Sequence, residues 1–464
     1  MTTRSSRLAL ASLSLSLLLS SLDTSIANIS LPTLARVFDA PFQTVQWVVL
    51  AYLLTITALI VSAGRLGDLF GRRRLLLAGI LSFTATSALC GAAPTVALLI
   101  AARALQGLGA AALIALSMAL VGDAVPKEQT GRAMGLLGTM SALGTTLGPS
   151  LGGMLIAGFG WRALFWINVP LGLATFALAS RHLPADRRDA AAPAPRFDHG
   201  GTLLLALTLA AYALSMTLGR GQIGPRNLML LAAALSGAAG FVWWELRAKA
   251  PLMHLAWLRE PALGAGLAAS ALVATVVMST LVVGPFYLTR GLGMTTALVG
   301  LTLSAGPLVA ALSGMPAGRL VDRLGAGRMV GAGLAGMALG ATLLAVLPAS
   351  LGVIGYMAPV MVITAHYALF QAANNTAVMR GIPADRRGVV SGMLNLARNL
   401  GLISGASLMG AVFAHATGSR SISSASPAAV ADGMRATFAV AACLLAAALL
   451  FTLAQRRSGG GQPA

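Results

Sequence analysis

The sequence predicts an all-α membrane protein with fourteen transmembrane helices, and three observations support that fold class. Hydrophobic residues make up 57% of the 464 residues and charged residues only 10%, whereas soluble globular chains carry about 25% charged residues. The hydrophobic residues form blocks of about twenty, the length at which a helix crosses ~30 Å of hydrocarbon. The 53 glycines and many alanines suit helices that pack closely in lipid.

Fourteen apolar blocks follow one another along the chain, and the seventh and eighth are the least distinct. They cover approximately residues 9–31, 44–63, 75–93, 96–121, 131–157, 161–180, 200–218, 227–246, 262–288, 296–317, 328–348, 351–375, 389–413 and 434–455. The first block follows Arg4 and Arg7 as in a signal peptide, but it continues past Asp23 to Pro32 without a small-residue cleavage site. We therefore expect an uncleaved first span.

The net charge of +19 lies mainly in short loops between the apolar blocks. With the N-terminus placed inside, 23 lysines and arginines fall at the inner side and 7 at the outer side, while Arg103 and Arg398 fall within spans. This bias follows the positive-inside rule, so we expect both termini in the cytoplasm. Nucleic acid is not an expected partner, because no basic face with interleaved aromatic residues is present.

Two sequence motifs occur twice. Residues 64–71, GRLGDLFG, recur as residues 318–325, GRLVDRLG, at an offset of 254. Residues 126–131 resemble residues 383–388 at an offset of 257. Two motifs at nearly one offset indicate duplicated halves, a common construction in membrane transporters.

The offset predicts three segments. A first half of six spans covers residues 1–181, an inserted segment with two spans covers residues 182–261, and a second half of six spans covers residues 262–464. Both halves begin inside, so they are parallel copies, and two inserted helices leave that orientation unchanged. The longest stretch outside the membrane, about 182–199, is too short for a soluble domain.

The loop from Gly64 to Arg74 joins the second and third spans. Glycine permits a tight turn, and Asp68 can accept hydrogen bonds from backbone amides at a helix start. A generic positively charged loop would explain the arginines, but not the glycine–aspartate spacing or its repetition. The candidate residues in the two copies of the loop are Gly64, Asp68, Gly71, Arg72, Arg73, Gly318, Asp322 and Gly325.

The fifth span carries glycines at fixed spacing. After Gly135 come Gly144, Gly148, Pro149, Gly152 and Gly153. Glycines let a partner backbone approach closely, and proline kinks a helix. A plain packing face of small residues is the alternative to a functional motif.

Asp23 is the only acidic residue that falls well within the predicted hydrocarbon region. It lies ~12 Å from the outer end of the first span, and Arg103 lies ~10 Å from the outer end of the fourth, at 1.5 Å per residue. A carboxylic acid in a water-poor cavity can alternate between protonated and ionised forms. We hypothesise that protonation of Asp23 frees Arg103 and biases a conformational switch. The alternatives are a permanent structural pair and, for Arg103, a side chain that extends toward the interface.

Several further polar residues fall at depth in the predicted spans and could line an internal cavity. They are Gln106 in the fourth span, His366, Gln371, Asn374 and Asn375 in the twelfth, and Asn395 and Arg398 in the thirteenth. A buried histidine is more often a hydrogen-bonded structural residue than a proton relay, and the amides could equally bridge neighbouring helices. The single deep acid favours neutral compounds or monocations over dications as ligands.

Together these features resemble the major facilitator superfamily, and within it the fourteen-span drug:proton antiporters. The loop is similar to the motif G-x-L-x-D-R-x-G-R-R, with Leu69 in place of the usual arginine, so a salt bridge from that position is not expected. The fifth span matches G-x8-G-x3-GP-x2-GG, and the fourth matches R-x-x-Q-G-x-G from Arg103 to Gly109. The first span resembles L-D-x-T-[IV]-[VA]-N-x-A-L-P from Leu22, with Ser25 where the pattern has threonine, and the thirteenth resembles N-x-x-R-N-x-G.

The resemblance implies a major facilitator fold arranged 6+2+6 in a bacterial inner membrane. It implies a proton-coupled secondary active exporter of small amphipathic drugs or toxic compounds that works by alternating access. In such a protein the two loops hold the halves together in one state, the fifth-span motif goes with export, and Asp23 carries the coupled proton. A dedicated exporter of one specific metabolite or antibiotic is the alternative, and a membrane sensor that transports nothing is a third interpretation.

No cofactor, metal or enzymatic activity is expected. A nucleotide-binding loop of the form G-x4-G-K-[ST] is absent from the sequence, which argues against ATP-driven export. No nucleophile–base pair or metal-ligand cluster stands out, and Cys90 and Cys443 lie isolated in apolar blocks. The expected partners are the lipid bilayer, protons and a small-molecule substrate. We expect a monomer and leave open an association with periplasmic and outer-membrane efflux partners.

Overall fold

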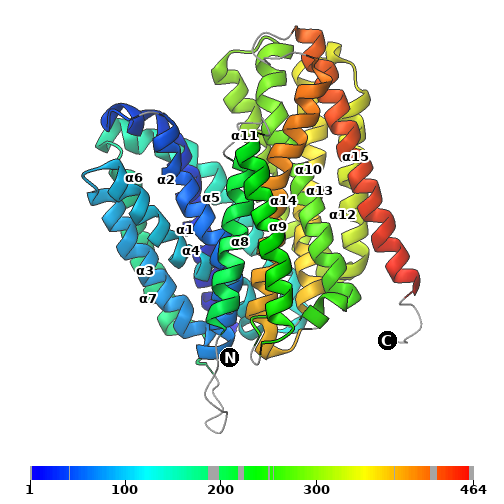
Figure 1. Ribbon diagram of the computed structural model, residues 1–464. Helices are drawn as coiled ribbons and strands as arrows, with labels where there is room; N and C mark the ends of the chain where they lie inside the picture. Colours follow the sequence, from blue (N-terminus) through cyan, green and yellow to red (C-terminus); the bar gives the residue numbers. More distant parts are fainter. Residues whose placement is uncertain are drawn as a thin grey trace.

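The computed structural model describes residues 3–40, 42–186, 198–217, 224–248, 251–253, 255–380, 382–418 and 426–458, and the chain in these ranges is helical without any strand (Figure 1). Most of the predicted long loop, 182–199, lies outside the described residues. The same holds for several basic residues of the predicted charge distribution, namely Arg187, Arg188, Arg196, Arg220, Lys249 and Arg420.

The described α-helices are α1 (Thr3–Val37), α2 (Phe42–Phe70), α3 (Arg72–Ala92), α4 (Val96–Ala124), α5 (Thr130–Phe159), α6 (Ala163–Trp166), α7 (Asn168–His182), α8 (His199–Thr217), α9 (Pro225–Glu245), α10 (Pro261–Phe286), α11 (Thr296–Leu324), α12 (Ala326–Val346), α13 (Gly352–Arg380), α14 (Arg387–Ala416) and α15 (Pro427–Ser458). Short helical turns join several of them: η1 (Lys127–Gln129), η2 (Leu255–Arg259), η3 (Tyr287–Gly291), η4 (Ala349–Leu351) and η5 (Ala384–Arg386).

Thirteen helical segments in the described chain are long and apolar enough to cross a membrane, with α6 and α7 together forming one of them. The helix α5 is bent by 42° between Thr130–Gly148 and Leu151–Phe159, and it is a fourteenth span when the bend is taken as a kink within one helix. Pro149, the predicted site of a kink, falls at this bend, although its side chain lies outside the described residues. The predicted all-α fold with fourteen spans is confirmed.

Both copies of the repeated loop turn at a glycine. Gly71 lies between α2 and α3 with a φ of 107°, and Gly325 lies between α11 and α12 with a φ of 90°. Residues that carry a Cβ atom rarely adopt this backbone region. The predicted tight turn therefore occurs in both copies, and it lets one helix follow the other with a single intervening residue.

The helices form two groups, with the inserted pair lying against both of them (Figure 1). The first group holds α1–α7 and the second holds α10–α15. The helix α8 contacts α2 of the first group and α14 of the second, while α9 packs against α8. The segment boundaries placed at residues 181 and 261 stay a prediction.

The two groups meet through two equivalent helix pairs, α2 with α14 and α5 with α11. Glycines bring the backbones close. A Cβ atom on Gly64 would overlap the carbonyl group of Gly388, and one on Gly135 would overlap the carbonyl oxygen of Gly314. We call this end of the bundle, which holds the loops after α2 and α11, the loop end. The helix α1 begins at this end, and α15 ends toward it (Figure 1).

Candidate functional site

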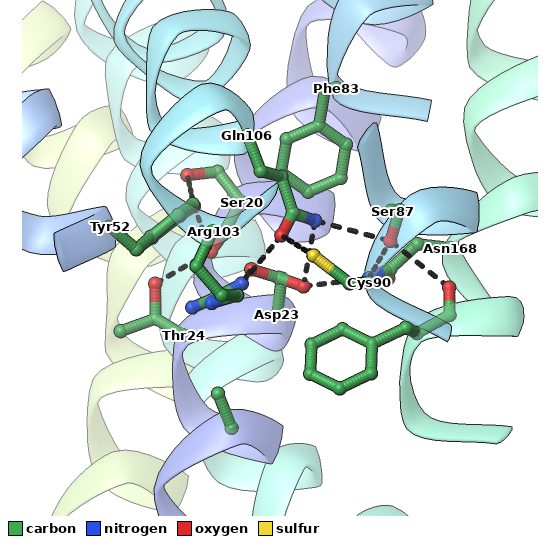
Figure 2. A network of polar contacts seen from close by, with 12 residues as sticks. Ser20, Asp23, Thr24, Tyr52, Phe83, Ser87, Cys90, Arg103, Gln106 and Asn168 are labelled. Atoms are coloured by element: carbon green, nitrogen blue, oxygen red, sulfur yellow. Dashed lines mark hydrogen bonds and ion pairs between the residues drawn. The ribbon is translucent and has the colours of Figure 1, made fainter. Parts of the chain in front are cut away.

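Asp23 and Arg103 form an ion pair inside the first group of helices (Figure 2). Asp23 lies on α1 and Arg103 on α4, and Asp23 Oδ2 is 2.5 Å from Arg103 Nη1. The two side chains are 1% and 0% exposed. A buried ion pair needs further hydrogen bonds to offset its lost hydration, and neighbouring helices supply them.

Two amide side chains complete the surroundings of Asp23 (Figure 2). Asn168 on α7 donates from Nδ2 to Asp23 Oδ1 over 2.7 Å, and Gln106 on α4 donates from Nε2 to the same oxygen over 3.1 Å. Gln106 Oε1 accepts from Arg103 Nη1 over 2.7 Å. The hydroxyl of Ser87 on α3 accepts from both amides, each over 3.1 Å. Asp23 therefore receives three hydrogen bonds from side chains.

The guanidinium of Arg103 also contacts α2. Its Nε donates to the carbonyl oxygen of Val48 over 2.9 Å, and its central carbon lies 4.1 Å from the centre of the Tyr52 ring. Its Nη2 is buried and has no hydrogen-bond partner among the described residues. One donor of a buried cation thus remains available for another partner.

The sequence predicted part of this cluster. Asp23 and Arg103 lie together, in line with their similar estimated depths. Gln106, expected to line a cavity, is fully buried beside the pair instead. Asn168 was missed, although a lone amide in an apolar span could have marked it, and Ser87 carries no such signal. The role of Asp23 and Arg103 in proton coupling stays a prediction.

A carboxylate of the first loop contacts a helix of the second group. Asp68 Oδ1 accepts a hydrogen bond from the backbone N–H of Gly388 and Oδ2 accepts one from the N–H of Val389, each over 2.9 Å. Both amides lie in the first turn of α14, where backbone N–H groups lack partners within the helix. Asp68 thus accepts hydrogen bonds at a helix start, as its chemistry allowed, and that helix belongs to the opposite group.

The second loop repeats this contact in the other direction. Asp322 Oδ1 accepts from the backbone N–H of Gly131 over 2.7 Å, and Oδ2 accepts from the N–H of Arg132 over 2.8 Å. Both amides lie in the first turn of α5, in the first group. We call these two carboxylate–helix contacts the Asp68 latch and the Asp322 latch.

A chain of ion pairs runs beside the Asp68 latch. Arg72 donates from Nη2 to Asp68 Oδ1 over 2.8 Å and from Nη1 to Asp123 Oδ2 over 2.9 Å. Arg387, at the start of α14, donates to Asp123 Oδ1 over 2.8 Å. Asp123 thereby joins arginines from both groups. Arg387 occurs in the second motif copy, but nothing in that motif marks its partner.

The remaining residues of the first loop act within the first group. Arg73 donates from Nη2 to the carbonyl oxygen of Ser180 over 2.6 Å. The backbone N–H groups of Arg73 and Arg74, at the start of α3, donate to the carboxylate of Asp186 over 2.9 and 3.1 Å. A Cβ atom on Gly71 would overlap that carboxylate. Arg73 therefore contacts α7 rather than the second group.

The glycine motif of α5 forms a packing surface for α1. A Cβ atom on Gly144 would lie 2.8 Å from the carbonyl oxygen of Leu18, and one on Gly148 would overlap the side chain of Ser25. Gly152 is also buried, whereas a Cβ atom on Gly153 would meet nothing within 4 Å. The motif thus fits the small-residue packing that its spacing allows, and a role in export stays a prediction.

A small cavity lies between α4 of the first group and α10, α13 and α14 of the second. Helices α13 and α14 supply most of its lining, with one residue each from α4 and α10. The lining residues are Met118, Ser270, Tyr367, Phe370, Gln371, Asn375, Leu394, Asn395 and Arg398. Four residues predicted to line a cavity, Gln371, Asn375, Asn395 and Arg398, are therefore brought together.

Two other candidates on α13 are placed elsewhere. Asn374 is buried and donates from Nδ2 to the carbonyl oxygen of Gly266 and to the Ser270 hydroxyl, over 3.1 and 2.9 Å, so it bridges α13 and α10. His366 Nδ1 lies 2.8 Å from the carbonyl oxygen of Val362, and a Cβ atom on Gly336 of α12 would overlap its ring. Asn374 thus fits the helix-bridging alternative, and His366 fits the alternative of a hydrogen-bonded structural residue packed against α12.

The chain resembles known membrane transporters over most of its length. A profile described as Major Facilitator Superfamily matches residues 13–406 and also residues 267–463. The chain is 33% identical to the multidrug resistance protein Stp of Mycobacterium tuberculosis over 422 residues, which cover 89% of this chain and 76% of that protein. It is 35% identical over 284 residues to the tetracenomycin C resistance and export protein of Streptomyces glaucescens, covering 61% and 52% of the two chains. The solved structure of the proton:xylose symporter XylE has the same fold, with a TM-score of 0.68 at 16% identity over 98% of this chain and 96% of that chain.

Proposed function

Because the chain belongs to the major facilitator superfamily, we propose that it is a proton-coupled exporter of small amphipathic compounds that works by alternating access. Similarity to a multidrug resistance protein and to an antibiotic export protein supports the outward direction of transport. The glycine pattern of α5, which resembles the antiporter motif, supports the same direction. The substrate is moved across a membrane and is not chemically changed.

The loop end is proposed to face the cytoplasm of a bacterial cell. The excess of lysines and arginines on this side supports that orientation, which places both termini inside. Every hydrogen bond that directly joins α1–α7 to α10–α15 in the described chain lies toward this end. In this orientation the hydrogen bonds between the groups close the cytoplasmic side.

The two latches are proposed to open and close that side. A carboxylate at a helix start contributes about 0.3–2 kcal/mol, so two latches stabilise the closed side by a few kcal/mol. A stabilisation of this size can be overcome when substrate and protons bind differently to the two states. The latches therefore suit a contact that breaks and re-forms in every transport cycle.

Asp23 and Arg103 are proposed as the proton-coupling pair, and their buried contact is the observation that carries the proposal. Protonation of Asp23 would leave Arg103 as a buried cation without a counter-ion. Breaking a buried pair in this way costs about 3–5 kcal/mol. A rearrangement that gives Arg103 another partner or water would relieve that cost, which links proton binding to a change of state.

Inverted membrane vesicles test this assignment. We expect a pH gradient to drive transport of amphipathic dyes into vesicles that hold the wild-type chain, and Asp23→Asn to transport without responding to the gradient. The control is Asp432→Asn, because the Asp432 side chain on α15 is 66% exposed. If Asp23→Asn keeps the full response, the pair is structural and the assignment of Asp23 is wrong. A panel of anionic, neutral and cationic dyes keeps the test independent of substrate charge.

A dedicated exporter of one metabolite or antibiotic is the second candidate function. Similarity to the tetracenomycin C resistance and export protein favours it. Expression in a host that lacks its own exporters separates the two candidates. Resistance to many unrelated compounds supports a broad exporter, and resistance to a single chemical family supports a dedicated one.

A further inference from the structure

The cavity between the groups contains one cation and no carboxylate among its lining residues. That cation is Arg398, which lies near the middle of α14. Among the described residues Arg398 takes part in no ion pair, and its buried Nε has no hydrogen-bond partner. An arginine within a membrane span is energetically costly and normally faces a partner or a polar cavity. The structure supplies the cavity without the partner.

Three further polar side chains of the cavity come from one face of α13. Tyr367, Gln371 and Asn375 are spaced by four residues, which places them on successive turns of the helix. Within the described chain no side-chain hydrogen bond joins any of them to another group. A hydroxyl and two amides can each donate a hydrogen bond. Together with Arg398 they leave several unused donors around one space.

Asp23, the deep acid from which we expected neutral or monocationic ligands over dications, is not among the residues that line this cavity. Asp23 is 1% exposed and is engaged by Arg103 within the first group of helices. The cavity therefore has a positive lining, with apolar walls from residues such as Phe370 and Met118.

We propose that this cavity binds an amphipathic monoanion, in which a carboxylate, sulfonate or phenolate pairs with Arg398 and an aromatic or aliphatic body lies against the apolar wall. The amides of Gln371 and Asn375 donate to the same anionic group or to polar substituents beside it. A single cation matches a single negative charge. The inference rests on the proposed function in taking this cavity as the substrate site. An interior-negative membrane potential would then favour outward movement of the anion.

Three probes that share one ring system test the charge preference. They are 2-naphthoate, 2-naphthylmethanol and 2-naphthylmethylammonium, with charges of −1, 0 and +1. Binding is measured by calorimetry on the purified full chain in lipid nanodiscs, without a pH gradient. We expect naphthoate to bind at least about tenfold more tightly than the other two, because hydrogen bonds to charged groups contribute about 1.5–3 kcal/mol.

Substitution of Arg398 tests the residue. We expect Arg398→Gln to weaken naphthoate binding about 10- to 100-fold and to change binding of the alcohol by less than about threefold. Arg398→Lys keeps the positive charge but lacks the planar guanidinium group. Its affinity for naphthoate should lie between those of the wild type and Arg398→Gln. The matched control is Arg435→Gln on α15, whose side chain is 39% exposed, and it should leave all three affinities unchanged. If Arg398→Gln does not fold, Gln371→Leu serves as the second variant. It removes a hydrogen-bond donor from the cavity without changing the charge of the lining, and it should weaken the binding of naphthoate alone.

Two results would overturn the proposal. One is binding of the alcohol or the ammonium compound as tight as that of naphthoate. The other is an equal loss of affinity for all three probes in the Arg398 and Gln371 variants, which would indicate a structural role for these residues. A different result would contradict the exporter proposal alone: naphthoate binds as expected, but a pH gradient drives transport of no compound of any charge in vesicles.

Discussion

Asp68 and Asp322 occupy equivalent positions in the two sequence repeats, and each accepts two backbone hydrogen bonds at the start of a helix in the opposite group. The two helices that donate these hydrogen bonds, α14 and α5, are themselves equivalent. Each group thus offers one carboxylate and one helix start to the other. The loop end therefore contains two equivalent latches that can be tested independently.

Neutralising either aspartate should loosen the loop end. Asn in place of Asp68 or Asp322 removes the charge that a helix start favours and leaves one good acceptor for two N–H groups. We expect each variant to raise the population with separated loops about tenfold, and the double variant to raise it further. Spin labels at Glu128 and Asp385, two exposed positions at this end, report the distance between the groups by pulsed electron resonance.

Asp186→Asn is the matched control for the latch variants. Asp186 also accepts two backbone hydrogen bonds at a helix start, but that helix, α3, belongs to its own group. Its neutralisation should leave the label distances as they are in the wild type. Equal effects of all three single variants would mean that the distance change reflects a general loss of stability and not the latches.

A methyl group on Gly135 should disturb the same contact by a steric route. A Cβ atom there would overlap the carbonyl oxygen of Gly314 on α11, whereas a Cβ atom on Gly138, three residues later on α5, would meet nothing within 4 Å. Overpacking costs about 1–3 kcal/mol, so Gly135→Ala should separate α5 from α11 and reduce dye export about tenfold or more. Export by Gly138→Ala should stay within about twofold of the wild type. Similar export by the two variants would contradict close packing of α5 and α11 during transport.

The fold could be predicted because the membrane imposes a length on every span. Blocks of about twenty apolar residues identified the helices, but the predicted spans were shorter than the helices themselves. The first span was predicted at about 9–31, whereas α1 begins at Thr3 and extends to Val37. Helices continue into the polar interface, where hydropathy no longer marks them. The repeat predicted the equivalence of the loops, but it did not say which helix start each aspartate reaches, because the sequence contains two equivalent starts.

The candidate site was predictable only where a residue type is rare in a membrane. Asp23 and Arg103 stood out because few charges lie at depth, and helix rise was enough to match them. Asn374 and Asn375 could not be separated by sequence, since adjacent helical residues point about 100° apart and only the rotation of α13 decides which one reaches the cavity. The structure places Asn375 in the cavity lining and Asn374 against α10.

The inserted helix α8 should respond to loss of its hydroxyl contact with α14. Tyr212 is hydrogen-bonded to the hydroxyl of Ser404, and the Ser407 hydroxyl donates to the carbonyl oxygen of Met216 over 3.1 Å. Tyr212→Phe removes one contact of about 0.5–1.5 kcal/mol, while Ser404 keeps its bond to the carbonyl oxygen of Leu400. We expect faster hydrogen exchange in the second half of α8 and unchanged exchange in α12. Unchanged exchange in α8 would mean that the hydrogen bond between Tyr212 and Ser404 does not help to hold this helix, and that its other contacts with α2, α9 and α14 are sufficient.

A double-mutant cycle should show that Asp23 and Arg103 are energetically coupled. Arg103→Gln leaves a buried carboxylate without its cation, and Asp23→Asn leaves a buried cation without its carboxylate. Each should lower stability by about 3–5 kcal/mol, while the double variant should lose at least about 2 kcal/mol less than the two single losses combined. Thermal unfolding of the purified chain in one detergent measures all four proteins. Additive losses would show that neither side chain senses the charge of the other, and proton binding at Asp23 could then not act through Arg103.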